Sequence, residues 1–304
     1  MQRQKKQNNE SRMMVSFIIL NYKRSDLTRR CVSSIEQFLG SVQKEIIVVD
    51  NGSGTEALKK LEVLRGQCTL IECRQNGGFG CGNNRGAEAA HGNYLCFVNS
   101  DVTFSHDCIS PLVDYMQEHS EVGVITPQQL NSEGKPVATF KHTPGLRHEL
   151  LGDGLFERMQ PQKYPRRKQY DRTEPFCVSQ ICGPLMLFDA QKFWNIGAFD
   201  TNIFLYYEEY DICRRLRMHG YTCVVYPTLT YHHIHGGSTT PSHQTTRELH
   251  ISKLYTYRKH HNRMMSSLFQ LVNLMQILRK PYKWYLLPVV TTGEYLSHSM
   301  RHKK

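Results

Sequence analysis

MVSFIILNY, Met14 to Tyr22, and KEIIVVDNGSG, Lys44 to Gly54, are the two apolar runs that decide the fold of this chain. Each run ends in polar residues, as expected for a strand that is covered on both faces. Between them, SDLTRRCVSSIEQFL, Ser25 to Leu39, carries apolar residues at the i, i+4 spacing of a helix. A strand, a helix and a second strand in this order predict a parallel unit.

The same alternation continues along the chain. A helix is predicted at about 56–65, followed by a short strand, the glycine-rich segment NGGFG, a further helix and the strand of NYLCFVNSDV. Later strands are predicted at VGVITPQQL and GPLMLF, whereas the polar residues 131–176 indicate long connections outside the core. The sequence therefore predicts an α/β fold with a mostly parallel sheet flanked by helices. Ligands of such sheets bind at the carboxyl ends of the strands, where DNGS, NGGFG and NSD fall.

The composition limits the kinds of binding partner and the cellular compartment that we expect for this protein. The formal charge of +11 favours an anionic partner, which could be nucleic acid, a membrane surface or a phosphorylated substrate. Ten cysteines are scattered without a C-x-x-C pair, which indicates buried thiols in a reducing compartment. The first dozen residues lack the apolar segment of a signal peptide, and no run approaches the length of a membrane span. We therefore expect a cytoplasmic protein.

Three polar segments are candidate ligand sites. NGGFGCGNNRG lacks the lysine of a Walker loop; its glycines would let a backbone approach a diphosphate, although a tight turn explains them equally well. In NSD, Asp101 can ligate a hard cation such as Mg²⁺ or Mn²⁺, or end the strand in an ordinary turn. In YHHIHGGST, His233 and His235 share one face of a strand, a pattern that is more often structural than metal-binding.

The segment FLYYEEYDICRRLRMHGY places Glu208, Glu209 and Asp211 at the start of a predicted helix. The helix dipole favours acids in a first turn, and Asp211 can pair with Arg214 or Arg215. Neither glutamate finds a cation on its own helix. The cluster is therefore either a solvated helix start or part of a site.

Taken in order, these segments resemble the family 2 glycosyltransferases, and among them the rhamnosyltransferase-like branch that builds bacterial surface polysaccharides. The resemblance covers about residues 14–240 and rests on VSFIILNY, VVDNGSG, NGGFGCGNNRG, FVNSDV, GPLMLF, FDTNIFLYYEEYDICRRLRMHGY and HIHGGST. It implies a GT-A fold and an inverting transfer of a sugar from a nucleotide-diphosphate donor to a lipid-linked or growing surface-glycan acceptor. Deoxythymidine-diphosphate-rhamnose is the favoured donor, and uridine-diphosphate sugars stay open.

The resemblance also implies roles for single residues. Glu209 matches the catalytic base, with Glu208 beside it in the same acidic pair. Asp101 matches the last acid of the D-x-D motif and His233 the histidine that completes the shell of a divalent cation, Mg²⁺ or Mn²⁺. Asn99 replaces the first aspartate of that motif, which leaves the need for the metal open. The implied donor-binding residues are Asn21, Asp50, Asn76, Gly77, Gly78, Ser100 and Gly183.

We expect three segments: a disordered polar N-terminus at 1–12, a GT-A catalytic domain at 13–246 and a basic amphipathic helical tail at 247–304. From Ile251 onward the tail holds ten Lys and Arg against the single acid Glu294. Its segment SSLFQLVNLMQIL would either lie on anionic lipid, with the basic residues at the headgroups, or pack on the catalytic domain. Membrane contact would fit a lipid-linked glycan acceptor at the inner face of the cytoplasmic membrane.

Two other functions compete with glycosyl transfer. A nucleic-acid-binding protein is suggested by the charge, but the chain lacks a recognisable binding module and its charge lies outside the sheet motifs, so we expect no nucleic acid. A catalytically silent nucleotide-sugar binder is suggested by Asn99.

Overall fold

The computed structural model describes residues 13–234, 242–292 and 299–302. The expected disordered N-terminus, 1–12, lies outside the described residues, as do His235 and most of HIHGGST.

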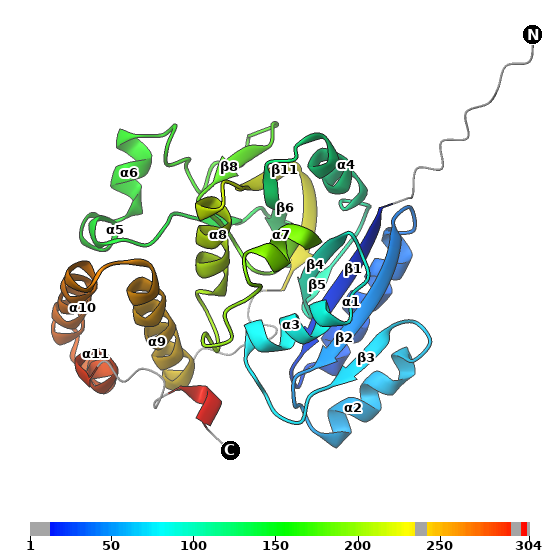
Figure 1. Ribbon diagram of the computed structural model, residues 1–304, viewed down its shortest axis with the longest axis horizontal. Helices are drawn as coiled ribbons and strands as arrows, with labels where there is room; N and C mark the ends of the chain where they lie inside the picture. The colour runs from blue at the N-terminus through cyan, green and yellow to red at the C-terminus, as the bar shows by residue number, and fades with distance from the viewer. Residues whose placement is uncertain (1–12, 235–241, 293–298, 303–304) are drawn as a thin grey trace, which may run out of the picture.

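A nine-stranded sheet forms the centre of the protein (Figure 1). One half of it is parallel, and its strands in spatial order are β3 (Thr69–Glu72), β2 (Gln43–Asp50), β1 (Met14–Asn21) and β4 (Tyr94–Asn99). The other half continues with β10 (Leu185–Asp189), β6 (Val122–Leu130), β11 (Thr222–His233) and β5 (Val102–Thr103), and β8 (Phe176–Val178) also pairs with β11. A second, small sheet joins β7 (Phe140–Lys141) to β9 (Gln180–Ile181). The predicted α/β fold with a mostly parallel sheet is confirmed.

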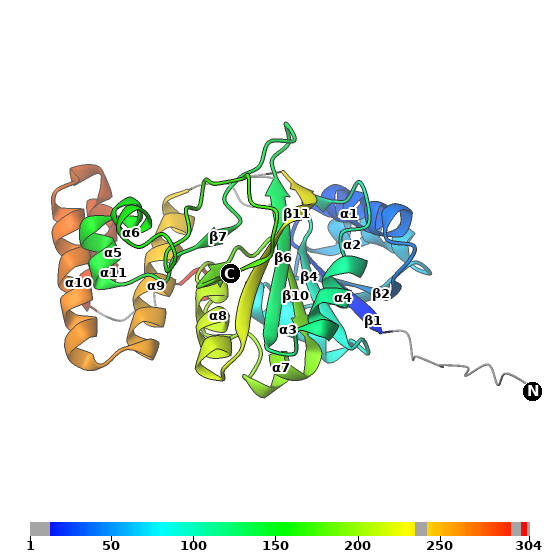
Figure 2. The ribbon, with the colours of Figure 1, turned by 90° about the horizontal axis from the view of Figure 1, so that it is seen from above.

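Helices cover both faces of the large sheet (Figures 1 and 2). One apolar core lies under α1 (Ser25–Phe38), α2 (Thr55–Leu61), the 3₁₀ turn η1 (Glu62–Leu64) and α4 (Ser110–Glu118). The other lies under α3 (Phe79–Glu88), α7 (Ala190–Asn195) and α8 (Glu208–Met218). Successive side chains of a β-strand point to opposite faces of the sheet, so each buried strand contributes side chains to both cores. This is why the sequence of such a strand is continuously apolar.

The C-terminal part is helical, as expected. Its elements are α9 (His243–His260), α10 (Arg263–Leu278), η2 (Pro281–Leu286), α11 (Leu287–Thr292) and η4 (Met300–His302). Of these, α9, α10, η2 and α11 share an apolar core of their own and lie at the side of the molecule that also carries α5 and α6 (Figure 2). The tail therefore packs as a folded unit of the protein.

Two segments differ from the sequence-based expectation. Residues 131–176 contain the short helices α5 (Leu146–Leu151) and α6 (Asp153–Met159), which bury no residue fully and so leave little periodicity to detect. β11, Thr222–His233, was not predicted as one continuous strand, because Pro227 interrupts its apolar run; a register shift between Tyr226 and Thr230 accommodates this proline.

The ten cysteines all lie within the described part of the chain, and none of them forms a disulfide. Among the residues that the structure describes, no helix combines the length and the apolar character needed to cross a bilayer.

Candidate active site

Asn21 and Asp50 lie side by side at the carboxyl ends of β1 and β2, because the register of these strands pairs them. Nδ2 of Asn21 donates a hydrogen bond of 2.6 Å to Oδ1 of Asp50, and the backbone N–H of Ser53 donates one of 3.0 Å to Oδ2. The hydroxyl of Thr28 in turn donates to Oδ1 of Asn21 over 2.8 Å. Asp50 is thus a buried, rigidly held carboxylate that still has lone pairs for an N–H group of a ligand.

Asn51, the residue after Asp50, organises the glycine-rich loop. Its Nδ2 donates to Oδ1 of Asn76 over 2.9 Å and to the carbonyl of Gly78 over 3.1 Å, and its Oδ1 accepts from the backbone N–H of Gly77 over 3.1 Å. Sequence analysis did not single out Asn51. Its place at the end of a buried strand was the available signal.

Gly78 joins the glycine-rich loop to the segment that leads into α8. Its φ of +91° favours glycine, and a Cβ at this position would lie 2.4 Å from the carbonyl oxygen of Phe204. The backbone N–H of Phe79 donates to that same carbonyl over 2.8 Å. A larger residue at position 78 would therefore push two site segments apart.

Asp101 and His233 meet because β5 pairs with β11 just beyond Asp101. Nε2 of His233 lies 3.1 Å from Oδ1 of Asp101, and the other ring nitrogen lies 3.1 Å from Nε2 of Gln129. Both Asp101 and the neighbouring Ser100 are buried. Within the described chain, neither oxygen of Asp101 has a hydrogen-bond partner in bonding geometry, which is costly for a buried carboxylate.

This pair fits a hard divalent cation. A buried carboxylate and an adjacent imidazole nitrogen are suitable ligands, and Mg²⁺ or Mn²⁺ takes its remaining ligands from water and phosphate oxygens. The described residues contain no cluster of three or more His, Cys, Asp or Glu that could hold a metal ion. Two protein ligands completed by a substrate are therefore the arrangement that these residues allow.

The chain turns sharply immediately before the acidic cluster. Tyr206 and Tyr207 have φ angles of +69° and +70°, in the left-handed region that residues with side chains rarely occupy. α8 begins directly afterwards, at Glu208. Such strain persists where the surrounding structure over-determines it, and it clusters at active sites.

Glu208 and Glu209 occupy different environments. Glu208 is buried, with its Oε1 unpartnered among the described residues; burial in the first place, and the charge of Glu209 in the second, raise the pKa of Glu208 well above its usual range. Glu209 is half-buried and lies against Gly183, where a Cβ would come within 2.7 Å of Oε1 of Glu209. Its charge raises the pKa of the nearby Lys141. The raised pKa favours the protonated form of the buried Glu208, whereas Glu209 is the carboxylate that lines the cavity.

Glu209 lines a cavity of about 400 Å³. The other polar and aromatic residues of the cavity wall are Lys141, His142, His148, Glu149, Asp153, Arg167, Gln180, Tyr206 and Tyr207. Many of these charges are already paired: Arg167 lies 3.0 Å from Asp153 and 2.8 Å from Glu157, and His148 lies 2.8 Å from Asp153. A wall of paired charges, amides and aromatic rings suits a neutral ligand rich in hydroxyl groups, which both donate and accept hydrogen bonds.

A continuous series of contacts joins the predicted site segments. The backbone N–H of Asn99 donates to the carbonyl of Pro184 over 2.8 Å, and the preceding Gly183 touches Glu209. Asn51 and Gly78 complete the connection from β2 to the segment before α8. The predicted residues that lie along this series are Asn21, Asp50, Asn76, Gly77, Gly78, Ser100, Asp101, Gly183, Glu208, Glu209 and His233.

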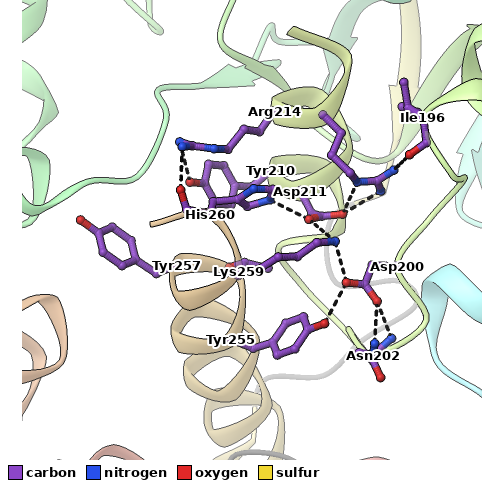
Figure 3. A network of polar contacts seen from close by, with 12 residues as sticks. Ile196, Asp200, Asn202, Tyr210, Asp211, Arg214, Tyr255, Tyr257, Lys259 and His260 are labelled. Atoms are coloured by element: carbon purple, nitrogen blue, oxygen red, sulfur yellow. Dashed lines mark hydrogen bonds and ion pairs between the residues drawn. The ribbon is translucent and has the colours of Figure 1, made fainter. Parts of the chain in front are cut away.

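Asp211 belongs to a separate network that ties α8 to α9 (Figure 3). Arg215, its partner on α8, donates from Nε to Oδ2 over 2.8 Å. From α9, Nε2 of His260 and Nζ of Lys259 each lie 2.7 Å from Oδ1, and Lys259 also reaches Asp200. Burial alone would raise the pKa of Asp211, but the bond to His260 and the charges of Arg215 and Lys259 outweigh it and hold this pKa well below its usual range. Sequence analysis missed His260 and Lys259, which no local pattern connects to Asp211.

Comparison with known proteins identifies the family to which the chain belongs. The sequence model of the family described as "Glycosyl transferase family 2" matches residues 16–197, which is more than half of the chain.

Two glycosyltransferases are similar in sequence to this chain over about two thirds of its length. The low-salt glycan biosynthesis hexosyltransferase Agl10 of Haloferax volcanii is 28% identical over 67% of this chain and 61% of its own length. The N-acetylglucosaminyl-diphospho-decaprenol L-rhamnosyltransferase of Mycobacterium tuberculosis is 23% identical over 68% of this chain and 75% of its own length. The chain thus spans about three fifths of the length of Agl10.

Among solved structures, the fold resembles that of GalNAc-T7, which was determined with UDP, GalNAc and Mn²⁺. The TM-score is 0.60 at 17% identity, covering 94% of this chain and 59% of that one. This likeness supports the GT-A type of fold.

Proposed function

This chain belongs to the glycosyl transferase family 2, and on that premise we propose that it transfers a sugar from a nucleoside-diphosphate donor to an acceptor hydroxyl, with inversion at the anomeric carbon. The observation that carries the proposal is the position of Glu209. It is a half-buried carboxylate that lines a cavity suited to hydroxyl groups and that touches Gly183, next to the strand end of Asn99.

The proposed reaction is a single displacement. Glu209 accepts the proton of an acceptor hydroxyl held in the cavity, while the hydroxyl oxygen bonds to the anomeric carbon. The bond from that carbon to the diphosphate oxygen breaks on the opposite face, so the configuration inverts and the nucleoside diphosphate leaves. General-base assistance of this kind contributes about 10²–10⁴-fold to a rate.

Glu208 is proposed to support Glu209 from the first turn of α8. It is buried, and burial together with the charge of Glu209 raises the pKa of Glu208, which favours its protonated form. Glu208 would thus help to hold this turn in place, while Glu209 reaches the acceptor in the cavity.

On the donor side, Asp50 is proposed to contact the base of the nucleotide and the loop at Asn76–Gly78 its diphosphate. A divalent cation would be held by Asp101 and His233, and when bound it would neutralise the charge that the departing diphosphate gains. The burial of the Asp101 carboxylate beside the His233 ring supports this assignment. The Mn²⁺ in the GalNAc-T7 structure supports it as well.

For the sugar we propose rhamnose, carried by deoxythymidine diphosphate, and for the acceptor a lipid-linked glycan. Support comes from the mycobacterial relative, whose name combines a rhamnosyl transfer with an N-acetylglucosaminyl-diphospho-decaprenol. A lipid-linked acceptor would require the protein to work at a membrane surface.

A donor screen tests the binding half of the proposal. Thermal unfolding is followed with several nucleotide sugars, with and without Mn²⁺, and a stabilising donor is then offered with a lipid-linked acceptor. Donor binding without transfer to any acceptor would favour a silent nucleotide-sugar binder instead.

The variant Glu209→Gln tests the catalytic half. Turnover should fall by about 10²–10⁴-fold while donor binding persists, because only the proton acceptor is removed. Glu118→Gln, on the exposed surface of α4, is the matched control and should leave turnover unchanged. Near-full turnover of a folded Glu209→Gln protein would show that Glu209 is not the base.

A further inference from the structure

Helix α10 exposes an apolar stripe on the side that faces away from its own core. The inward residues Phe269, Val272 and Ile277 are buried. The outward residues, at helical spacings of three and four, are Met264, Leu268, Leu271, Met275 and Leu278, each 42–73% exposed. An exposed apolar stripe on the face opposite the core is typical of an interaction site.

A second set of exposed apolar residues lies on the neighbouring helices α5 and α6. These residues are Leu150, Leu151, Leu155 and Met159, with exposed fractions between 41% and 67%. Nε2 of Gln276 on α10 donates to the carbonyl of Glu149 on α5 over 3.1 Å, so the two sets lie on elements in contact. We call the two sets together the α5–α10 surface. It carries more than a third of the exposed large apolar side chains in the described residues.

Two amphipathic aromatic residues follow α10 directly. Tyr282 is 71% and Trp284 is 51% exposed, and Lys283 stands between them with its ammonium 5.9 Å from the ring of Tyr282. Aromatic residues with one polar end and flexible lysines suit the boundary between an apolar and a hydrated layer.

The charge around the α5–α10 surface is positive. Between Arg263 and Thr292 the sequence contains no Asp or Glu. The basic residues of this stretch are Arg263, Arg279, Lys280 and Lys283.

On α5 and α6, the three acids are each paired with a base. Glu149 lies 2.7 Å from Lys253, while Asp153 and Glu157 lie 3.0 Å and 2.8 Å from Arg167. The exposed bases of these helices and of the following loop are Arg147, Arg158, Lys163, Arg166 and Lys168, and they outnumber the two exposed acids of that loop, Asp171 and Glu174. The surface therefore presents apolar side chains within a field of surplus positive charge.

We propose that the α5–α10 surface docks the protein onto a membrane that contains anionic lipids. The apolar side chains would enter the boundary between headgroups and acyl chains, and the surrounding lysines and arginines would contact the headgroups. A second copy of the chain fits less well, because two such surfaces would bring surplus positive charges face to face.

The docking of the α5–α10 surface onto a membrane would also indicate where the acceptor lies. This second step rests on the proposed function. α5 and α6 also supply His148, Glu149 and Asp153 to the wall of the cavity that Glu209 lines. The same two helices thus carry the lipid-facing leucines and part of the proposed acceptor site. A glycan that projects from a lipid in the bound membrane would have a short path to Glu209.

Flotation of the full-length protein with liposomes tests the proposal. Vesicles of phosphatidylcholine alone are compared with vesicles that also contain phosphatidylglycerol, at low and high salt. We expect binding to the anionic vesicles that weakens as salt rises, because headgroup attraction is screened. Absence of binding to either vesicle at low salt would overturn the proposal.

The triple variant Leu268→Glu, Leu271→Glu, Met275→Glu should lower the partition onto anionic vesicles about tenfold or more, since it removes apolar insertion and adds repulsion. All three residues are exposed, so the fold should persist. The matched control changes Val63, Trp194 and Met218 to Glu, three comparably exposed apolar residues outside the α5–α10 surface. The proposal is wrong if the triple variant binds like the control, or if its change alters only the oligomeric state in sedimentation velocity.

Transfer to a soluble, lipid-free acceptor separates this proposal from the proposed function. Loss of vesicle binding by the triple variant with unchanged soluble transfer supports the surface. Vesicle binding by a wild-type protein that transfers no sugar would leave the surface intact and refute the enzymatic role.

Discussion

Replacing Asp211 by asparagine should destabilise the protein strongly, because Asp211 is the fully buried anion that joins α8 to α9. Its carboxylate neutralises Arg215 and Lys259 and also contacts Nε2 of His260, at distances of 2.7–2.8 Å. Asparagine keeps the shape of the side chain but removes the charge. The variant therefore leaves partly buried cations without their common counter-ion.

The size of the effect follows from burial. Removing one partner of a buried ion pair costs about 3–5 kcal/mol. The lower end applies here, because the side chain of Lys259 is 29% exposed and keeps Asp200 as a partner. With an unfolding entropy of about 2.1 cal/mol/K per residue, or about 0.6 kcal/mol/K for 304 residues, a loss of about 3 kcal/mol lowers the melting temperature by about 5 °C.

The effect should also depend on pH in a defined direction. The pKa of Asp211 is held below its unfolded value, so its charge stabilises the fold above about pH 4, and this stability is lost as pH falls toward the folded pKa. The gap in free energy of unfolding between wild type and Asp211→Asn should therefore be full at pH 7 and shrink below about pH 4.

Calorimetry or urea unfolding at several pH values measures this gap. Asp114→Asn, on the exposed face of α4, is the control and should change stability by less than about 0.5 kcal/mol. A double-mutant cycle with Lys259→Met should give a coupling of about 0.5–3 kcal/mol, since the two side chains touch. A gap below about 1 kcal/mol at pH 7, or zero coupling, would refute the reasoning.

Three further predictions address the site directly. Gly183→Ala should lower kcat by up to about 100-fold with little change in melting temperature, because its Cβ would meet Oε1 of Glu209 at 2.7 Å. A kcat within twofold of wild type would contradict this. Gly78→Ala should lower the free energy of unfolding in urea by about 1–3 kcal/mol and weaken donor binding. The new side chain would combine a φ of +91° with a contact of 2.4 Å to the carbonyl of Phe204. A wild-type free energy of unfolding would contradict this. Mn²⁺ should raise the melting temperature of the wild type in the presence of nucleoside diphosphate but not that of Asp101→Asn, and an equal rise in both would contradict the proposed metal site.

Local patterns predicted the parallel half of the fold well. The βα units around β1, β2 and β4 carry continuous apolar runs and helical spacing, and both are set by residues close in sequence. The positions of Asn21, Asp50 and Asp101 at or just after neighbouring strand ends could be predicted for the same reason, because parallel strands end at one edge of a sheet, whereas the roles of these residues were implied by the family resemblance. Roles within that edge stay predictions until tested.

Non-local pairing accounts for what the sequence could not predict. Nothing in GPLMLF indicates that β10 inserts antiparallel between β4 and β6, since strand order depends on partners far along the chain. The choice of Arg215 over Arg214 as the partner of Asp211 also needed the tertiary structure. Arg214 instead donates to the carbonyl of His260 over 2.9 Å, a contact across more than forty residues.

The contacts of α9 connect the two proposals. Besides Asp211, α9 holds the carbonyl of Leu205 through Ser252 Oγ over 2.8 Å, immediately before the strained pair Tyr206 and Tyr207. Lys253, the next residue, pairs with Glu149 in the cavity wall. Since α9 also packs against α10, one helix touches the proposed lipid-facing unit, the strained turn and the acceptor wall. We therefore expect the tail to maintain the shape of the cavity as well as to dock the protein onto the membrane. Loss of α9 would then impair transfer to soluble acceptors, whereas charge changes confined to the outer face of α10 would not.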